Sequence, residues 1–254
     1  MIFFLENFLL KTYLAVYAVK KIFNRYRRAH CIWKNKSNSL INLVGLSVGI
    51  TACLLIALFV QHELSYDQWN PNLDRLVRVD TDIKFGGNQL NMATSSAVVG
   101  PEAKELLPAI EQFCRIRKYG DFLIKTENQN NYSEQNILVA DNSLFELFPT
   151  EIIAGNAATF LTQPQSLVLS KTMAEKYFGN SQNAVDKNLI LDNDETWLVT
   201  GVYADFPATQ HFKADFVLSL VGNEEVVNAP PFWVANNNFH TYFLLQPHVQ
   251  LEQF

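Results

Sequence analysis

A run of 21 residues without a charged side chain constrains this chain more than any other feature. It extends from Leu40 to Val60, LINLVGLSVGITACLLIALFV, and Gln61 after it is also uncharged. A helix of about this length crosses a hydrocarbon core of roughly 30 Å. We therefore expect residues 40–61 to form a transmembrane helix.

Two other structures contain long apolar helices, namely the core of a large globular protein and a cleaved signal peptide. A core helix seldom lacks charge over such a length, because one of its edges usually meets water. A signal peptide begins near the first residue and ends in a small-x-small cleavage site. Here the run begins at residue 40 and is followed by QHELSYD. The sequence therefore favours an uncleaved span.

Charge divides the chain into three compartments. Residues 1–39 carry eight Lys or Arg and a single acid, Glu6, whereas residues 62–254 carry 12 basic and 24 acidic side chains, a net charge of −12. Because short segments rich in Lys and Arg remain in the cytoplasm, we expect a cytoplasmic N-terminus and an acidic part on the opposite side. An acidic part in that place also argues against a nucleic-acid partner.

Residues 1–39 are hydrophobic as well as basic. Lys11 and the basic group from Lys20 to Arg28 interrupt the apolar side chains. We expect a basic amphipathic segment on the cytoplasmic membrane surface, facing anionic lipid. The alternative is a second span between Lys11 and the basic group, which would move the N-terminus across the membrane and leave the acidic part where it is.

One face of the expected span consists of small residues. Gly45, Gly49 and Cys53 recur every four positions. Such spacing lets a second helix approach closely, so we expect these three residues to pack against a partner helix. Glycine is also common in membrane helices that have no partner, which is the alternative.

From residue 62 onward, strand-like and helix-like pieces alternate, which predicts an α+β fold: a mixed α/β domain divided into two lobes. In SLVLSKTMAEKYFG, a strand ends at the N-cap residue Ser170 and a helix ends at Gly179. A hairpin is expected around Asp192. DNSLFELFP predicts a helix capped by Asp141 or Asn142, and RLVRVDTDIKF predicts one continuous strand.

His62 and Glu63 form the pair with which a zinc-protease helix begins. Such a helix needs a second His four residues after the first, and that position is Tyr66. The other histidines, including His211, are scattered, and three cysteines form neither a disulfide framework nor a metal cluster. The sequence also lacks a P-loop and a nucleophile elbow. We therefore predict no catalytic site, no metal and no cofactor.

The same stretch is better interpreted as the junction between the span and the acidic domain. The residues that we assign to it are His62, Glu63, Tyr66, Asp67 and Trp69. Tyr and Trp collect at membrane–water interfaces because their rings have an apolar body and a polar edge. We therefore expect Tyr66 and Trp69 at that interface.

Several segments, in this order, resemble the MacB/FtsX-type permeases of ABC transporters. They are NKSNSLINLVGLSVGITACLLIALFVQHELSYDQW with DRLVRV after it, SLVLSKTMAEKYFG, LVTGVYADFPATQHFKADF and NFHTYFLL. The resemblance covers residues 35–254. Trp69 stands where the family often has Phe, and residues 184–187 replace a turn that usually carries Gly before the Lys.

The resemblance implies a non-catalytic permease subunit of the bacterial inner membrane. Residues 62–254 would be the MacB-like periplasmic core domain, and the FtsX-like membrane part with three more helices would be missing, so we expect an N-terminal portion. Its partners would be membrane lipid, a second permease chain and a separate cytoplasmic ABC ATPase, whose ATP hydrolysis would drive export, efflux or lipoprotein release. The alternative is a single-span, membrane-anchored periplasmic binding or adaptor module.

Overall fold

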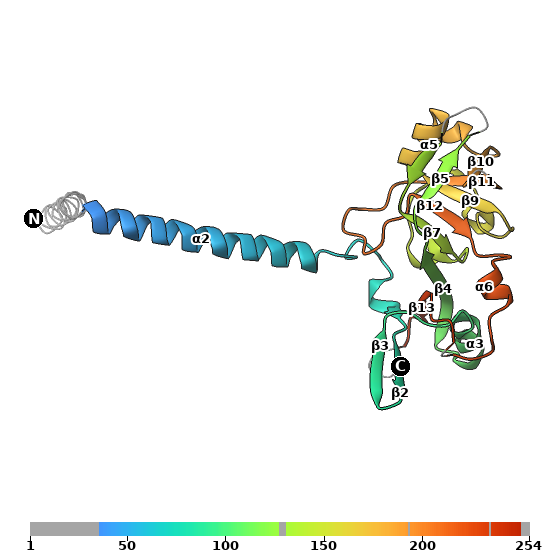
Figure 1. Ribbon diagram of the computed structural model, residues 1–254, viewed down its shortest axis with the longest axis horizontal. Helices are drawn as coiled ribbons and strands as arrows, with labels where there is room; N and C mark the ends of the chain where they lie inside the picture. The colour runs from blue at the N-terminus through green and yellow to red at the C-terminus, as the bar shows by residue number, and fades with distance from the viewer. Residues whose placement is uncertain (1–35, 127–130, 193, 234, 250–254) are drawn as a thin grey trace, which may run out of the picture. The chain divides into compact units, whose positions relative to one another are not determined.

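The computed structural model describes residues 36–126, 131–192, 194–233 and 235–249 (Figure 1). The chain divides into two compact units, residues 1–64 and residues 65–254. The basic segment expected over residues 1–39 lies outside the described residues except for its last four.

Helix α2, Lys36–Leu64, contains the whole uncharged run. Its 29 residues make it about 43 Å long, which exceeds the thickness of a hydrocarbon core. No side chain of α2 is buried within the described structure, so its apolar surface requires lipid or other helices. The apolar helix predicted from the sequence is thus confirmed, and it extends beyond residue 61.

Two polar side chains inside the uncharged run are satisfied by the helix itself. The Ser47 hydroxyl donates to the Leu43 carbonyl, and the Thr51 hydroxyl donates to the Ser47 carbonyl, each at 2.8 Å. Such bonds to the preceding turn leave no hydroxyl that needs water. The helix is therefore compatible with an apolar environment despite these residues.

Residues 65–249 fold around one mixed sheet of 11 strands. Its order is β1-β13-β4-β7-β12-β9-β11-β10-β5-β6, and β8 also pairs with β11. The pairs β7–β12 and β9–β11 are parallel, and the other pairs are antiparallel. The strands are β1 Leu76–Arg78, β4 Ile110–Lys118, β5 Phe122–Lys125, β6 Tyr132–Glu134, β7 Ile137–Ala140, β8 Ile152–Gly155, β9 Ser166–Ser170, β10 Asn188–Leu191, β11 Glu195–Tyr203, β12 Phe216–Ser219 and β13 His240–Leu245.

The central strands are buried on both faces because their side chains alternate between two cores. In β7, Ile137 and Val139 face one core, while Leu138 and Ala140 face the other. Strands β9 and β12 alternate in the same way. This two-sided burial explains why these strands are continuous apolar runs in the sequence.

Short helices cover the two faces. Helix α5, Lys171–Phe178, contributes Ala174 and Tyr177 to one core, called the α5-side core. Helix α4, Leu144–Leu147, contributes to the other, called the α4-side core. The remaining helical segments are α3 Val99–Leu106, α6 Glu224–Val227, η1 Leu73–Arg75, η2 Ala157–Thr159 and η3 Ser181–Asn183.

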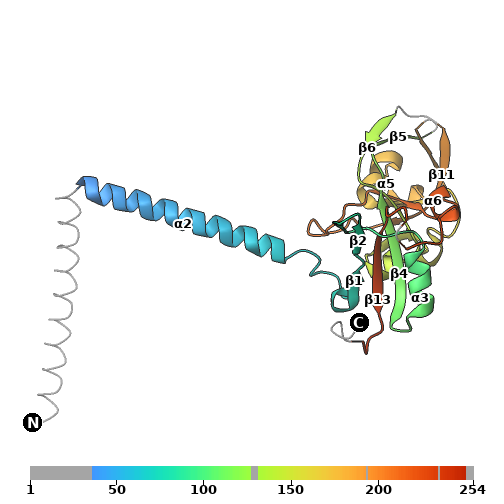
Figure 2. The same cartoon turned by 60° about the horizontal axis from the view of Figure 1, so that its bottom comes forward.

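The mixed α/β class predicted from the sequence is confirmed. The two expected lobes share one continuous sheet. At one end of it, α3 lies beside β4 and β13 (Figure 2). Near the middle of the strand order, α5 lies beside β9 and β11.

Local predictions have mixed outcomes. The Ser170 hydroxyl accepts a hydrogen bond from the Met173 N–H at 3.4 Å, and Gly179 ends α5 with φ +73°, as predicted. The predicted cap of α4 is wrong, because the N-cap is Ser143 and makes no side-chain cap bond. The Asp141 carboxylate instead accepts two hydrogen bonds from the Arg115 side chain, at 2.8 and 2.9 Å.

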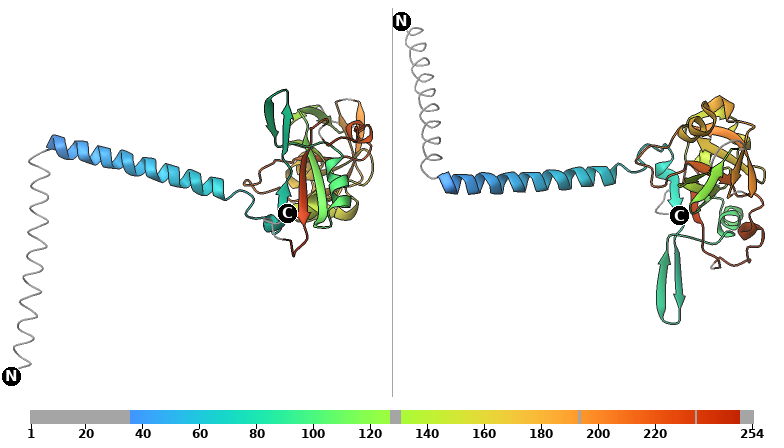
Figure 3. Two further views of the ribbon diagram at one scale, coloured as in Figure 1. Left: turned by 90° about the horizontal axis from the view of Figure 1, so that it is seen from below. Right: turned by 45° about the horizontal axis from the view of Figure 1, so that its top comes forward.

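The continuous strand predicted over residues 75–85 is divided in two. Strand β1 joins the main sheet, whereas β2, Thr81–Phe85, pairs with β3, Asn88–Met92, in a separate hairpin. Gly86 and Gly87 form its turn with φ +57° and +84°, and a two-residue turn of this kind favours glycine. The hairpin extends away from the rest of residues 65–249 (Figure 3).

Candidate functional site

The structure divides the five predicted junction residues between the two units. His62 and Glu63 lie in the last turn of α2. Tyr66, Asp67 and Trp69 belong to residues 65–72, the junction segment, which is part of the sheet-containing unit.

Asp67 fixes the junction segment through both its backbone and its side chain. It adopts a left-handed backbone with φ +58°, which Asp tolerates better than most residues. Its N–H donates to the Thr209 carbonyl at 2.9 Å, and its carboxylate accepts from the His211 N–H at 3.2 Å. The other carboxylate oxygen lies 2.8 Å from His211 Nδ1. Asp67 is thus bound to residues 204–215, the junction loop between β11 and β12.

His211 continues this chain of hydrogen bonds into the sheet. Its Nε2 lies 2.7 Å from the hydroxyl of Tyr242 on β13. Burial raises the pKa of Tyr242, so the hydroxyl stays protonated. It can donate to Nε2 of a neutral imidazole whose Nδ1–H is bound to Asp67, and it can accept from Nε2–H of an imidazolium. Both contacts are therefore retained in either protonation state of His211.

Aromatic rings pack against His211 and Tyr242 of the Asp67–His211–Tyr242 chain. The Phe148 ring centroid lies 5.8 Å from that of His211, 5.0 Å from that of Phe212 and 5.2 Å from that of Tyr242. Such ring pairs are worth about 0.5–1.5 kcal/mol each beyond their buried area. The junction loop is therefore packed on the α4-side core and is not a free surface loop.

Trp69 belongs to the same aromatic group. Its ring centroid lies 5.9 Å from that of Phe206, and it packs against the α4-side core. The ring is partly buried on the domain, and the expected place of Trp69 near a membrane–water interface stays a prediction.

Asn70 and Asn72 attach the junction segment at a second place. The Asn70 side-chain amide donates to the Leu147 carbonyl at 3.0 Å, and the Asn72 amide donates to the Glu146 carbonyl at 2.9 Å. These carbonyls belong to the end of α4, where a helix has no backbone donors of its own. The junction segment thus contacts both the junction loop and α4.

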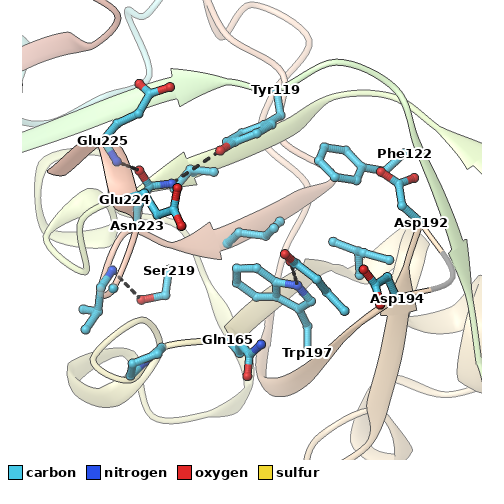
Figure 4. A pocket seen from close by; sticks show the side chains of 17 residues that line it. Tyr119, Phe122, Gln165, Asp192, Asp194, Trp197, Ser219, Asn223, Glu224 and Glu225 are labelled. Carbon is cyan, nitrogen blue, oxygen red and sulfur yellow. Dashed lines mark hydrogen bonds between the residues drawn. The ribbon is translucent and has the colours of Figure 1, made fainter. Parts of the chain in front are cut away.

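A cavity of about 680 Å³ lies elsewhere in the domain, beside β11 and α6 (Figure 4). Tyr119, Phe122 and Trp197 line it together with five carboxylates and no basic side chain. Several polar side chains have structural partners: Trp197 Nε1 donates to Glu195 at 3.0 Å, and the Leu123 N–H donates to Asp192 at 2.8 Å. The negative charge of the cavity favours a cation over an anion. The hydrogen bonds of Glu195 and Asp192 stabilise the wall of the cavity.

Glu225, at the edge of this cavity, is paired with Arg117, which also lies over the Tyr119 ring at 5.1 Å from the centroid. The hydrogen bond from Arg117 lowers the pKa of Glu225. Within the described ranges, no three His, Cys, Asp or Glu side chains are placed to hold a metal ion.

Comparison with known families identifies the domain. The family defined as the MacB-like periplasmic core domain matches residues 39–254. The chain belongs to this family.

Solved structures agree with the MacB-like fold. A permease-protein domain from Porphyromonas gingivalis is 23% identical with a TM-score of 0.61, and the match covers 73% of this chain and 79% of that domain. The periplasmic region of MacB from Actinobacillus actinomycetemcomitans is 11% identical with a TM-score of 0.51, over 70% of this chain and 78% of that region. No curated protein sequence matches the chain.

Sequence reasoning missed the partners of Asp67 in the MacB-like domain. By spacing alone His211 is one of several scattered histidines, although it lies in the family-like segment LVTGVYADFPATQHFKADF. A signal was present there, because Phe206 and Phe212 are large apolar residues in a stretch that forms neither helix nor strand, and both are packed on the α4-side core. A packed loop holds its polar residues in fixed positions.

We predict that Asp67→Ala lowers the free energy of unfolding of the domain by about 1.5–3 kcal/mol, because it removes hydrogen bonds to a charged group and leaves a left-handed alanine. Asp67→Asn should lower the free energy of unfolding by less than Asp67→Ala does, because Asn tolerates this backbone and still accepts a hydrogen bond from His211. Urea unfolding of residues 65–254 measures both. Asp74→Ala, at an exposed position of η1, is the control and should change stability by about 0.5 kcal/mol or less. If Asp67→Ala and Asp74→Ala changed the free energy of unfolding equally, the claim that Asp67 fixes the junction segment to the junction loop would be contradicted.

Proposed function

We propose that this chain is the membrane-anchored, non-catalytic part of an ABC-transporter permease of the bacterial inner membrane. The observation that carries the proposal is a MacB-like periplasmic core domain directly after an apolar helix long enough to span the membrane. The basic residues before the helix support a cytoplasmic N-terminus, with residues 65–254 in the periplasm. A separate cytoplasmic ATPase would hydrolyse ATP, and its movement would reach the periplasm through α2.

The junction segment supports a mechanical role. Only Ser65 and Tyr66 separate the end of α2 at Leu64 from Asp67, which is fixed to the junction loop. A connection of two residues allows little slack, because each residue spans at most about 3.6 Å. A displacement of the end of α2 would therefore be passed to β13 through His211 and to α4 through Asn70. Export, efflux and lipoprotein release are the outputs that such a movement would drive.

The face of Gly45, Gly49 and Cys53 supports a second permease chain as a partner. Nothing in the described structure lies within 4 Å of a Cβ added at either glycine, so this face of α2 has room for a close neighbour. Two helices that approach through small residues gain close van der Waals contact in lipid.

The function is tested by purifying the protein from membranes of cells that carry its natural gene and neighbouring genes. We expect an ABC ATPase subunit to co-purify in mild detergent, because the permease has no nucleotide-binding motif of its own. A Cys introduced at Gly86 should react with a membrane-impermeant thiol reagent from the periplasmic side, since Gly86 lies in an exposed turn. Recovery without an ATPase, as a lone anchored domain, would favour the binding-module alternative and contradict the proposal.

Helix packing is tested by oxidative cross-linking of Cys53 in native membranes, in a Cys31→Ser background. We expect a disulfide-linked dimer, because Cys53 lies on the small face, and Gly49→Leu should weaken it by separating the helices. Cys114 does not compete, since it is fully buried in the domain. The matched control is Cys53→Ser with Leu55→Cys, which moves the thiol about 200° around the helix. Equal cross-linking at both positions, or none at Cys53, would rule out a second copy on this face.

A further inference from the structure

One connection of the domain forms a wall of the larger cavity. Residues 221–233, called the strap, lie between β12 and β13 and contain the one-turn helix α6. Residues 221–225 of the strap line the cavity of about 680 Å³, and Asn223, Glu224 and Glu225 are seen beside Tyr119 in Figure 4. The position of the strap therefore determines how open this cavity is.

The backbone of the strap is not joined to the sheet. Within the described structure, no backbone hydrogen bond of residues 222–233 reaches a strand. The bonds that these residues make are local, such as that from the Val227 N–H to the Asn223 carbonyl at 2.9 Å. The junction loop differs, because the Asp215 N–H donates to the Asn136 carbonyl at 2.9 Å. The strap can therefore leave the sheet without breaking a strand pair.

Burial also contributes little to holding the strap. None of residues 221–233 is buried, although Val226 and Ala229 pack against the α5-side core. Val227 is 68% exposed and Phe232 is 62% exposed, whereas the junction loop buries the ring of Phe212. The free energy of opening a segment locally depends on the apolar surface and the hydrogen bonds that the opening exposes. The strap should therefore open more easily than the junction loop.

An ion pair is the main tether of the strap. Glu225 of α6 is paired with Arg117 of β4, and the two side chains are 35% and 24% exposed. The Tyr119 ring, whose centroid lies 5.1 Å from the guanidinium carbon, holds Arg117 in place. The hydrogen bond from Arg117 lowers the pKa of Glu225, so the pair is charged on both sides at neutral pH. A partly shielded pair of this kind is stronger than one in open solvent.

Two weaker contacts hold the ends of the strap. Near its start, the Asn223 amide donates to the Tyr119 hydroxyl at 3.4 Å. At its end, the Trp233 indole N–H donates to the Glu102 carboxylate on α3. All these tethers are polar side-chain contacts at the domain surface, which can break and re-form without repacking the core.

We propose that the strap is a lid, which opens away from the cavity while the sheet stays folded, and that the Arg117–Glu225 pair is its latch. Opening removes residues 221–225 from the cavity wall and separates Val226 from the α5-side core. It also unfolds α6, because a helix of one turn is not stable without its packing. A ligand that contacts the strap in the closed state would favour closure. The lid depends on the domain alone and not on the proposed permease function.

The test is amide hydrogen exchange of the full chain in mild detergent. In the wild type, we expect the N–H groups of Val227 and Asn228 to exchange faster than those of Asp215 and β12, because opening the lid exposes less surface than unfolding the sheet. Arg117→Gln should speed exchange in the strap roughly threefold to tenfold and leave β12 unchanged. Glu225→Gln should have a similar effect, and the double variant should add little to either single change.

The matched control is Arg78→Gln, which removes the same charge from another strand and breaks the exposed pair with Asp80. Exchange in the strap should not change in this variant, because the pair lies outside the latch. Three results would overturn the proposal. They are exchange in the wild-type strap as slow as in β12, no change in Arg117→Gln, and acceleration of the strap and β12 by the same factor.

Discussion

Burial of both faces of strands β7, β9 and β12 is the constraint on which the rest of the domain depends. Because neither face of the central sheet meets water, helices and loops must cover both sides, and each loop is held by the side chains that it buries. The junction loop shows this directly: Phe206 and Phe212 pack on the α4-side core, and the Tyr203 hydroxyl donates to the Ala214 carbonyl at 2.7 Å.

A loop held in this way gives the incoming chain a rigid surface to bind. The junction segment uses Asp67 to contact the loop and, through His211, the buried strand β13. Asn70 and Asn72 hold the end of α4. The junction segment is therefore held within the MacB-like domain by hydrogen bonds to the junction loop and to α4 and, through His211, to β13. The proposed passage of movement from α2 to the domain depends on this attachment.

Features set by local sequence could be predicted, and features set by long-range contacts could not. The apolar helix, the strand–helix unit closed by Ser170 and Gly179, and the hairpin around Asp192 each depend on neighbouring residues. Asp67 and His211 are 144 positions apart, and nothing near either residue indicates the other. Asp141 was a plausible helix cap by position, but Arg115 from another strand binds its carboxylate. Likewise, nothing near Trp69 in the sequence indicates that its ring packs on Phe206.

The central claim, that the junction segment is fixed to the domain, is tested most directly by amide hydrogen exchange of the intact protein in lipid nanodiscs. The N–H groups of Asp67 and Asn70 are bonded to Thr209 and Asp67 carbonyls, so we expect them to exchange slowly. In His211→Ala they should exchange about tenfold faster or more, while β7 stays protected. Exchange at Asp67 and Asn70 as fast as at the exposed turn of Gly86 and Gly87 in the wild type would contradict the account.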